Sequence, residues 1–117
     1  MEDCLFCKIV QGQVKSDTLF KDDRVVVIRD VNPQAPIHVL VLPVQHIRSI
    51  ADISPAHEPL IGYLFSVARR VAQQEGVAAR GYRLLINTGA EGGQTVGHLH
   101  IHLFGGKALG PMLCKHI

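Results

Sequence analysis

Hydrophobic residues recur along this chain with two different periods, and these periods predict its elements. Five short stretches rich in apolar and β-branched residues are typical of strands. They span residues 18–23, 24–30, 37–43, 82–87 and 98–106. Between Ser54 and Gly76, apolar residues recur every three or four positions, which predicts one long helix over 54–75. A shorter helix is expected over 4–11, because Gly12 can end it.

The apolar stripe of the long helix predicts the face that packs against the strands. It consists of Leu60, Ile61, Leu64, Phe65, Ala68, Val71 and Ala72. A turn at Asp22-Asp23 joins the first two strands, and no strand–helix alternation recurs along the chain. This order favours an α+β fold with an antiparallel sheet of about five strands, one long helix and one short helix. The 117 residues contain no repeat or linker, so a single domain over 1–117 is expected.

Composition and charge argue against several classes of protein. Hydrophobic residues make up 47% of the chain, which argues against a disordered protein. The formal net charge is only +2 and the basic residues are scattered, so neither nucleic acid nor a membrane surface is expected as a partner. No apolar run reaches the roughly 18–20 residues of a transmembrane helix. The N-terminus lacks a signal-peptide pattern, and a cytoplasmic location is therefore expected.

Three histidines at alternate positions, His98, His100 and His102, carry the strongest chemical signal. In a strand, alternate residues share a face, so the imidazoles should point one way and the aliphatic residues between them should face the long helix. Imidazole can attack a phosphorus or acyl centre. The glycine-rich loop over 88–97 can bring bare backbone N–H groups close to an anion. A histidine nucleophile beside such a loop suggests phosphoryl or nucleotidyl transfer.

Two other interpretations of these histidines stay open from the residues alone. His98 and His100 have the spacing with which two histidines on a strand chelate one metal ion. Such a pair would indicate a metal-dependent hydrolase or oxygenase with a further ligand elsewhere. The third interpretation is a set of ordinary hydrogen-bonded surface histidines.

The stretch QTVGHLHIHLF, residues 94–104, resembles the histidine-triad motif of the histidine triad (HIT) nucleotide-binding superfamily. The stretches FCKIVQGQV, RDVNPQAPIHVLVLP and GYRLLINTGAEGGQTV also resemble that family, in the expected order. The similarity covers about residues 4–113. Gly105-Gly106 and the GPM tail resemble the Hint branch, the nucleoside phosphoramidases, whereas the dinucleoside-polyphosphate hydrolase branch usually has Pro-Arg after the triad.

The resemblance implies a homodimer whose two sheets join edge to edge. It also implies hydrolysis of the P–N bond of purine nucleoside 5′-phosphoramidates such as adenosine 5′-phosphoramidate, to a nucleoside monophosphate such as AMP and an amine, with aminoacyl-adenylates as further candidate substrates. Two alternatives are a diadenosine polyphosphate hydrolase and a purine-nucleotide-binding regulatory protein with little turnover.

Roles for individual residues follow from the same resemblance. His100 would attack the α-phosphorus to form a nucleotidyl-histidine, and His102 would orient or protonate the site. Thr95, which stands where the Hint branch usually has serine, would assist the leaving amine, and Asn87 would hydrogen-bond near the phosphate. His38 would lie on the phosphate side or orient a triad histidine.

The remaining nucleotide contacts are expected at the ribose, the base and the glycine-rich loop. They are Asp30 at the ribose, Phe6, Ile9, Val31 and Leu40 at the base, and Gly93 and Gln94 in the loop. From the residues alone, Phe6 and Ile9 could equally belong to the core, and Asp30, Asn87 and Thr95 could be turn or strand residues.

Cys4 and Cys7 form a C-x-x-C pair, and the odd cysteine, Cys114, argues against a disulfide framework. C-x-x-C alone is a weak signal, because a tetrahedral metal site needs two more ligands. Resemblance to bacterial HIT proteins implies that His46, at P-x-x-H spacing, and His98 complete a structural zinc site. The alternative is two reduced cysteines that pack as small apolar residues.

Overall fold

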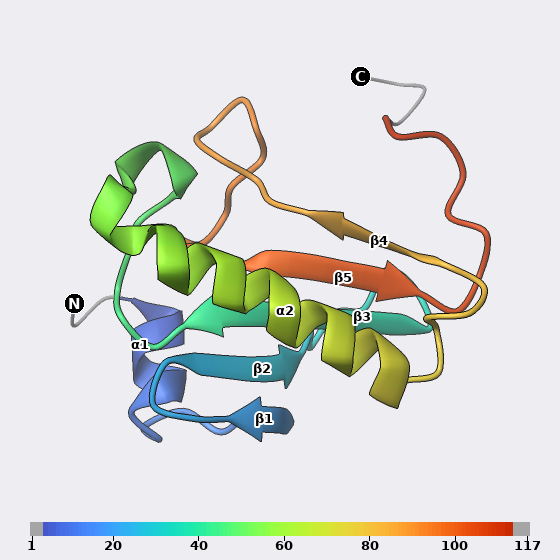
Figure 1. Ribbon diagram of the computed structural model, residues 1–117, viewed down its shortest axis with the longest axis horizontal. Coiled ribbons are helices and arrows are strands. Elements are labelled where there is room, and N and C mark those ends of the chain that lie inside the picture. Colours follow the sequence, from blue (N-terminus) through green and yellow to red (C-terminus); the bar gives the residue numbers. More distant parts are fainter. Residues whose placement is uncertain (1–3, 114–117) are drawn as a thin grey trace.

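The computed structural model describes residues 4–113, in which a five-stranded antiparallel sheet lies between two helices of unequal length (Figure 1). The strands are β1 (Thr18–Lys21), β2 (Val25–Arg29), β3 (Ile37–Pro43), β4 (Tyr82–Leu85) and β5 (Ile101–Gly105). The helices are α1 (Leu5–Val10) and α2 (Glu58–Gln74), and two 3₁₀ turns, Ile50–Asp52 and Pro55–His57, precede α2. The α+β fold is therefore confirmed. Cys114 lies outside the described residues.

The strand order is β1-β2-β3-β5-β4, so β5 lies between β3 and β4, and β4 lies at an edge of the sheet. Short turns connect β1 to β2 and β2 to β3, and the carboxylate of Asp22 accepts the backbone N–H groups of Arg24 and Val25 at the first of them. The long connection through α2 then crosses the sheet before β4 and β5 are added (Figure 1).

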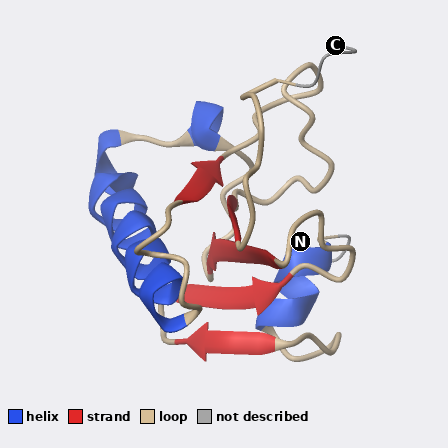
Figure 2. Ribbon diagram, turned by 90° about the vertical axis from the view of Figure 1, so that its right-hand side faces the viewer, coloured by secondary structure: helices blue, strands red, loops and turns tan. Residues whose placement is uncertain are grey.

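Both faces of the sheet are covered, α2 on one and α1 on the other (Figure 2). Successive side chains of a strand point to opposite faces. Val25 and Val27 therefore pack in the core beneath α2, while Val26 and Ile28 pack in a second cluster with Phe6 of α1. In a strand that is buried on both faces, polar and apolar residues do not alternate, because neither face meets solvent. This explains the continuous apolar run of β2.

The long helix follows its prediction closely, except that its first turn is a 3₁₀ turn. Its start is fixed by the backbone N–H of Ser54, which donates to Nδ1 of His57 at 2.9 Å. Its end comes at Gly76, whose φ of 77° is a left-handed conformation that glycine adopts without strain. No helix within residues 4–113 is long and apolar enough to cross a membrane.

The apolar stripe of α2 is rotated slightly from the predicted one. Its buried residues are Leu64, Val67, Ala68, Val71 and Ala72. The prediction was wrong for Phe65, which is 41% exposed. Val67 is buried in its place, because this residue lies on the helix face that packs against the sheet. The predicted contact of Leu99, Ile101 and Leu103 with the α2 core is confirmed.

Four of the five predicted strands are shorter in the structure, and the two differences that matter for the site are in β5 and β4. β5 begins at Ile101 rather than at residue 98, and β4 ends at Leu85 rather than at residue 87. The N–H of Leu99 donates to the carbonyl of Ile47 at 2.7 Å, so the backbone just before β5 binds the segment that follows β3 and not the strand ladder. The first two triad histidines therefore lie ahead of the strand.

Candidate functional site

The three triad histidines lie on the α1 side of the sheet, at the start of β5. His98 and His100 are buried, at 0% and 5% exposure, and His102 is half-buried. The rings of His100 and His102 are adjacent, with centroids 4.8 Å apart. Each ring is held by a different partner, and these partners fix which nitrogen of each ring carries the proton.

His98 is turned toward the cysteines of α1. Its Nε2 lies 2.8 Å from the carbonyl of Pro43, so this nitrogen carries the proton and donates it to the carbonyl. Nδ1 is then left with a lone pair, and it lies 3.3 Å from Sγ of Cys4 and 3.5 Å from Sγ of Cys7. The backbone of Pro43 thus selects the tautomer that binds a metal through Nδ1.

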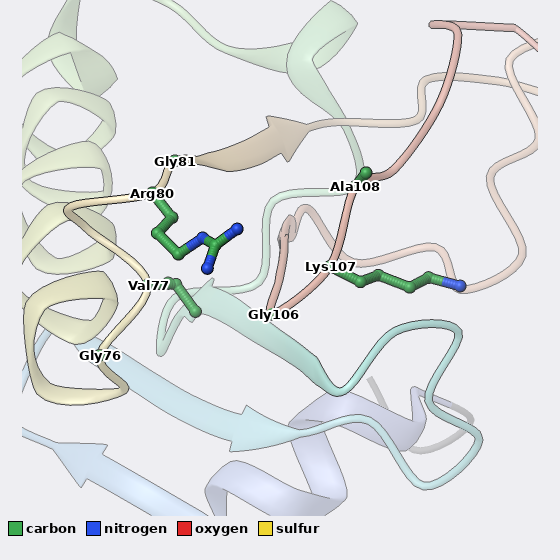
Figure 3. A pocket seen from close by; sticks show the side chains of 7 residues that line it. All are labelled: Gly76, Val77, Arg80, Gly81, Gly106, Lys107 and Ala108. Atoms are coloured by element: carbon green, nitrogen blue, oxygen red, sulfur yellow. The ribbon is translucent and has the colours of Figure 1, made fainter.

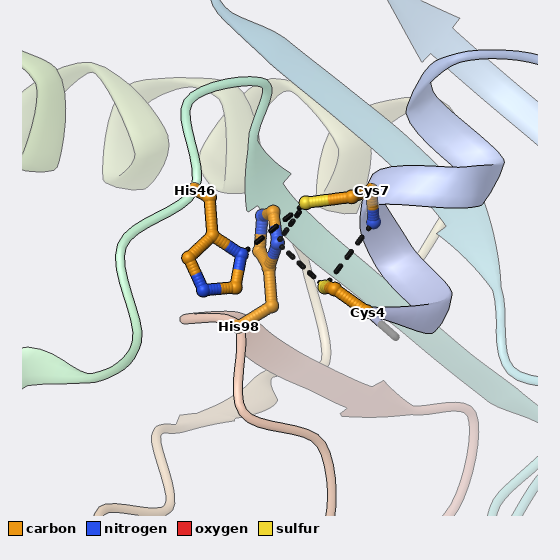
Figure 4. A group of neighbouring side chains, drawn as sticks. All are labelled: Cys4, Cys7, His46 and His98. Carbon is orange, nitrogen blue, oxygen red and sulfur yellow. Dashed lines mark hydrogen bonds between the residues drawn. The ribbon is translucent and has the colours of Figure 1, made fainter. Parts of the chain in front are cut away.

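The four predicted metal ligands converge (Figure 4). Cys7 Sγ also lies 3.2 Å from Nδ1 of His46, and one ligand atom from each of the four residues lies within 4.8 Å of the others. A tetrahedral zinc ion with Zn–S of about 2.3 Å and Zn–N of about 2.05 Å places sulfur and nitrogen ligands about 3.5 Å apart. The sulfur–nitrogen distances fit this geometry, so Cys4, Cys7, His46 and His98 can hold a metal ion.

The chemistry of this donor set indicates a structural centre. Four protein ligands fill a tetrahedron and leave no open position for a substrate. Burial, together with the neighbouring Cys4 thiol, raises the pKa of the Cys7 thiol to about 11. Without an ion the thiol is therefore neutral at pH 7, and metal binding would release its proton.

His100 is anchored through one nitrogen and free at the other. Its Nδ1–H donates to the backbone carbonyl of His98 at 2.7 Å, which leaves the lone pair on Nε2. Burial lowers the pKa of His100, so the ring is neutral at pH 7. Since Nδ1 of His98 faces the cysteines and Nδ1 of His100 faces a carbonyl, the two rings offer no shared position to an H-x-H metal ion.

His38 orients His102, and this is one of the two roles that were expected for His38. The N–H of Gln34 donates to Nδ1 of His38 at 3.2 Å, so the proton of this ring is on Nε2. That Nε2–H lies 3.0 Å from Nδ1 of His102 and 3.4 Å from a carboxylate oxygen of Asp30. His102 accepts at Nδ1, and its own proton is therefore on Nε2, where it is available to a ligand.

The same hydrogen bonds argue against a metal ion at Asp30, His38 and His102, although their ligand atoms also lie within 4.8 Å of one another. An ion on Nε2 of His38 would require the proton on Nδ1, which already accepts the Gln34 N–H. Burial lowers the pKa of His38, and burial with the neighbouring His100 and His38 lowers the pKa of His102 to about 4. Both rings are neutral at pH 7 and serve as hydrogen-bonding groups.

The glycine-rich loop is shaped by two of the predicted site residues. The amide of Asn87 donates to the carbonyl of Gly92 at 2.7 Å. The side chain of Gln94 donates to the carbonyl of Arg48 at 2.7 Å and accepts the N–H of Gly89 at 3.0 Å. A Cβ at Gly92 would lie 2.3 Å from the carbonyl oxygen of Thr88, so this position requires glycine.

Comparison with known proteins identifies the family. The HIT domain family matches residues 11–109. The purine nucleoside phosphoramidase of Escherichia coli strain K12 is 46% identical over 112 residues, which cover 96% of this chain and 94% of the relative. The chain belongs to the HIT family.

Solved structures of HIT proteins share this architecture. A HIT family hydrolase from Clostridium thermocellum superposes with a TM-score of 0.94 at 41% identity, covering 97% of this chain and 99% of that one. A histidine triad protein from Clostridium difficile superposes with a TM-score of 0.93 at 38% identity, covering 97% and 98% of the two chains. The predicted HIT fold is therefore confirmed.

The residues expected to contact a nucleotide in this HIT protein are not equally placed. Phe6 and Leu40 are buried in one cluster, at 4% and 5% exposure, and Ile9 packs partly buried against it. Asp30 accepts the N–H of Asn32 at 2.8 Å and lies beside His38. Val31 is 96% exposed and packs against nothing else.

Thr95 and Gly93 lie in the exposed part of the loop that precedes the triad. Gly93 has a φ of 80°, and the Asn87 amide lies 3.6 Å from where its Cβ would be. The Thr95 side chain is exposed. Sequence patterns did not identify the backbone groups that orient the histidine rings. Examples are the carbonyl of Pro43, which accepts from His98, and the N–H of Gln34, which donates to His38.

A separate hollow of about 360 Å³ lies between the end of α2 and the segment after β5 (Figure 3). None of the expected site residues lines it. Arg80 reaches into this hollow, but the side chain of Lys107 extends away from Arg80 (Figure 3). Because its two cations do not converge, the hollow lacks the focused polar groups of a ligand site.

Proposed function

We propose that this HIT protein is a hydrolase that cleaves the P–N bond of purine nucleoside 5′-phosphoramidates through a nucleotidyl-histidine. The observation that carries the proposal is the state of His100, a neutral ring whose Nδ1–H is bonded to a carbonyl and whose Nε2 lone pair is free. A lone pair fixed in this way is what a histidine nucleophile requires. The similarity to the E. coli purine nucleoside phosphoramidase supports the choice of substrate.

In the first step, Nε2 of His100 attacks the α-phosphorus and the P–N bond to the amine breaks. The bonding electron pair leaves with the amine nitrogen, which takes a proton from solvent by way of the Thr95 hydroxyl. Nε2–H of His102 donates to a non-bridging phosphate oxygen, because His38 already occupies its Nδ1. Donors fixed before the reaction stabilise the charge that develops on phosphorus oxygens.

In the second step, water attacks the same phosphorus and the bond to Nε2 of His100 breaks. The electron pair returns to Nε2, and the nucleoside monophosphate is released with the oxygen of the water. Nδ1–H of His100 stays on the His98 carbonyl throughout, so the ring is again neutral and ready for the next substrate. Asp30 would bind the ribose hydroxyls beside this site.

The proposal assigns zinc to the centre formed by Cys4, Cys7, His46 and His98. When bound there, zinc would form four bonds that connect α1 with the segment that precedes β5 and the segment that follows β3. The sulfur-to-nitrogen distances of 3.2 to 3.5 Å support this assignment. Because zinc needs both thiols reduced, the assignment also fits a cytoplasmic location.

A homodimer is part of the proposal, with the edge strands β4 of two copies joined into one continuous sheet. Among the described strands, β1 and β4 each have a single neighbour, and β4 is the edge that adjoins β5 of the triad. An edge strand presents unpaired backbone N–H and C=O groups that pair readily with a second strand. Neither nucleic acid nor a membrane is proposed as a partner.

The test is a parallel assay with adenosine 5′-phosphoramidate and diadenosine tetraphosphate, with His100→Ala as the control variant. We expect rapid AMP release from the phosphoramidate and none from the variant. Faster cleavage of the tetraphosphate would assign the protein to the diadenosine polyphosphate hydrolases. Binding of AMP without turnover of either compound would instead support a nucleotide-binding regulatory protein.

A further inference from the structure

In the sequence, Phe6 lies between Cys4 and Cys7, the two cysteines of the candidate metal centre. Its side chain contacts two of the triad histidines. It is 4% exposed, and its ring meets the ring of His100 edge to face, with centroids 4.9 Å apart and an interplanar angle of 90°. A second edge contact joins Phe6 to His98, with centroids 5.9 Å apart at 73°. Edge-to-face pairs of this kind favour one relative orientation of the rings.

A second link between the metal centre and His100 runs through the backbone. Nδ1 of the His98 ring faces Cys4 and Cys7, and the carbonyl of the same residue accepts Nδ1–H of His100 at 2.7 Å. One ligand of the centre therefore also selects the tautomer of the next histidine. The ring of His100 is held by the perpendicular ring of Phe6 and, at Nδ1, by the carbonyl of His98.

We propose that Phe6 is a positioning residue for His100, and that the Cys4, Cys7, His46 and His98 centre holds Phe6 in place. This inference rests on the proposed role of His100 as nucleophile. It gives Phe6 a different role from the base contact expected from the sequence. It also makes the metal centre a determinant of the reaction rate as well as of stability.

The length of α1 explains why the centre is needed. The helix has only six residues, and helices much shorter than about 12 residues are marginal on their own. Its inward contacts are few: Phe6 and Cys7 are buried, Ile9 and Val10 are partly buried, and Leu5 is 46% exposed. Loss of the ion removes the bonds to both ends of the C-x-x-C pair, and the Phe6 ring then loses its fixed position against His100.

The first experiment compares the zinc-loaded Phe6→Leu variant with zinc-loaded wild type. Leucine fills most of the space but has no ring edge. We expect kcat to fall about tenfold or more with KM within about twofold, because small displacements of a reacting group are costly while substrate contacts remain. Val26→Ala is the matched control, since Val26 belongs to the same cluster but lies on β2, two strands away from β5.

The second experiment does not depend on turnover. Imidazole ¹⁵N resonances of His100 are recorded in the full chain with zinc, after removal of zinc by a chelator, and in Phe6→Leu. We expect the Nδ1 and Nε2 signals of His100 to broaden or shift in the same direction on zinc removal and in the variant. Val26→Ala should leave them in place.

The inference is wrong if Phe6→Leu and Val26→Ala lower the unfolding midpoint and kcat to the same extent. It is also wrong if the His100 signals do not respond to zinc removal. Failure of the proposed function has a different signature, namely full activity in His100→Ala. In that case the ¹⁵N measurement still decides whether Phe6 and the centre position the ring.

Discussion

Single hydrogen bonds fix which nitrogen carries the proton in each of the three histidines of one short motif. Pro43 holds the proton of His98 on Nε2, and His98 holds the proton of His100 on Nδ1. His38 leaves His102 with its proton on Nε2. The lone pair of His98 faces the two cysteines, and the proposed mechanism uses the lone pair of His100 for attack and the N–H of His102 for the phosphate.

At this scale the sequence could predict which residues lie close together, but not which nitrogen of each histidine ring carries the proton. The C-x-x-C pair, the P-x-x-H spacing and the resemblance to bacterial HIT proteins were sufficient to predict four candidate metal ligands, which the structure brings together. The tautomers depend on backbone groups such as the carbonyl of Pro43 and the N–H of Gln34, which every residue has. Only the folded geometry shows which of these backbone groups face a ring.

Replacement of His38 by phenylalanine tests the orientation of His102. The variant His38→Phe keeps a ring against Phe104, whose centroid is 4.1 Å away, but removes the donor to Nδ1 of His102. We expect kcat with adenosine 5′-phosphoramidate to fall about tenfold or more, since His102 can then turn or change tautomer. His57→Ala is the control, because His57 lies at the start of α2 and outside the site. Equal kcat values in the two variants would contradict the role of His38.

The pKa of His102 predicts a pH dependence of stability. The groups that face its ring are His100, His38 and Asp30, and the pKa of His102 falls to about 4 in the folded protein from an ordinary value of 6.5. Between these two values the unfolded chain binds a proton that the folded protein does not, so stability decreases as the pH drops from about 6.5 to about 4.

Thermal unfolding of wild type and His102→Asn at pH 7.5 and pH 5 measures this dependence. We expect the midpoint of the wild type to fall more between the two pH values than that of the variant. Both proteins keep the histidines that do not contact His102, so the contributions of those residues cancel in the comparison. Parallel curves would show that His102 contributes nothing to the pH dependence.

At the scale of elements, the hydrophobic periods predicted each helix and strand, and errors arose at their ends. β5 starts three residues later than predicted, because the backbone of Leu99 pairs with Ile47. This pairing joins residues that are far apart in sequence, and no local period encodes it. The ends of α2 were easier to predict, since Ser54 and Gly76 act within one turn of the helix.

Substitutions of a glycine inside α2 and of the glycine just after its end should change stability in opposite directions. Gly76 has a φ of 77°, so Gly76→Ala should destabilise the protein by about 1–2 kcal/mol. Gly62 lies in the exposed interior of the helix, and a Cβ there would contact nothing within 4 Å. Gly62→Ala should therefore stabilise the protein by about 0.5–1 kcal/mol. Urea unfolding of both variants measures the effects, and the same sign in both would contradict the helix end at Gly76.

The metal centre is tested by metal analysis of protein purified without chelator. We expect about one zinc ion per chain in wild type and almost none in Cys7→Ser, since four ligands are needed for a closed tetrahedron. The unfolding midpoint of the variant should be lower and insensitive to added zinc, because an ion that binds only the folded state stabilises it. His57→Ala should retain the metal. Wild-type protein without a bound transition metal would rule out the centre.

At the scale of the whole molecule, the site depends on a strand order that the sequence did not predict. β5 pairs with β3, and this register places Leu40 opposite His102 and His38 opposite Phe104. His38 and the triad are separated by about sixty residues, so their contact follows from sheet topology alone. The family resemblance implied such a sheet. The hydrophobic periodicity predicted the strands but not which strands lie next to each other.

The open edge of β4 predicts the assembly state. Light scattering coupled to size exclusion should give a mass of about twice the 12.8 kDa of one chain. Pairing of two β4 edges would satisfy the free backbone groups of both copies. A mass of one chain at micromolar concentration would contradict the proposed dimer.

The central claim is that Nε2 of His100 becomes covalently bonded to the nucleotide. The most direct measurement is rapid quenching of the enzyme with adenosine 5′-phosphoramidate, followed by proteolysis and mass spectrometry of the peptide that contains the triad. We predict an added adenylyl group on His100 that forms within one turnover and disappears as AMP is released. An adenylyl group on another residue, or steady AMP release with no covalent species at any time, would contradict the claim.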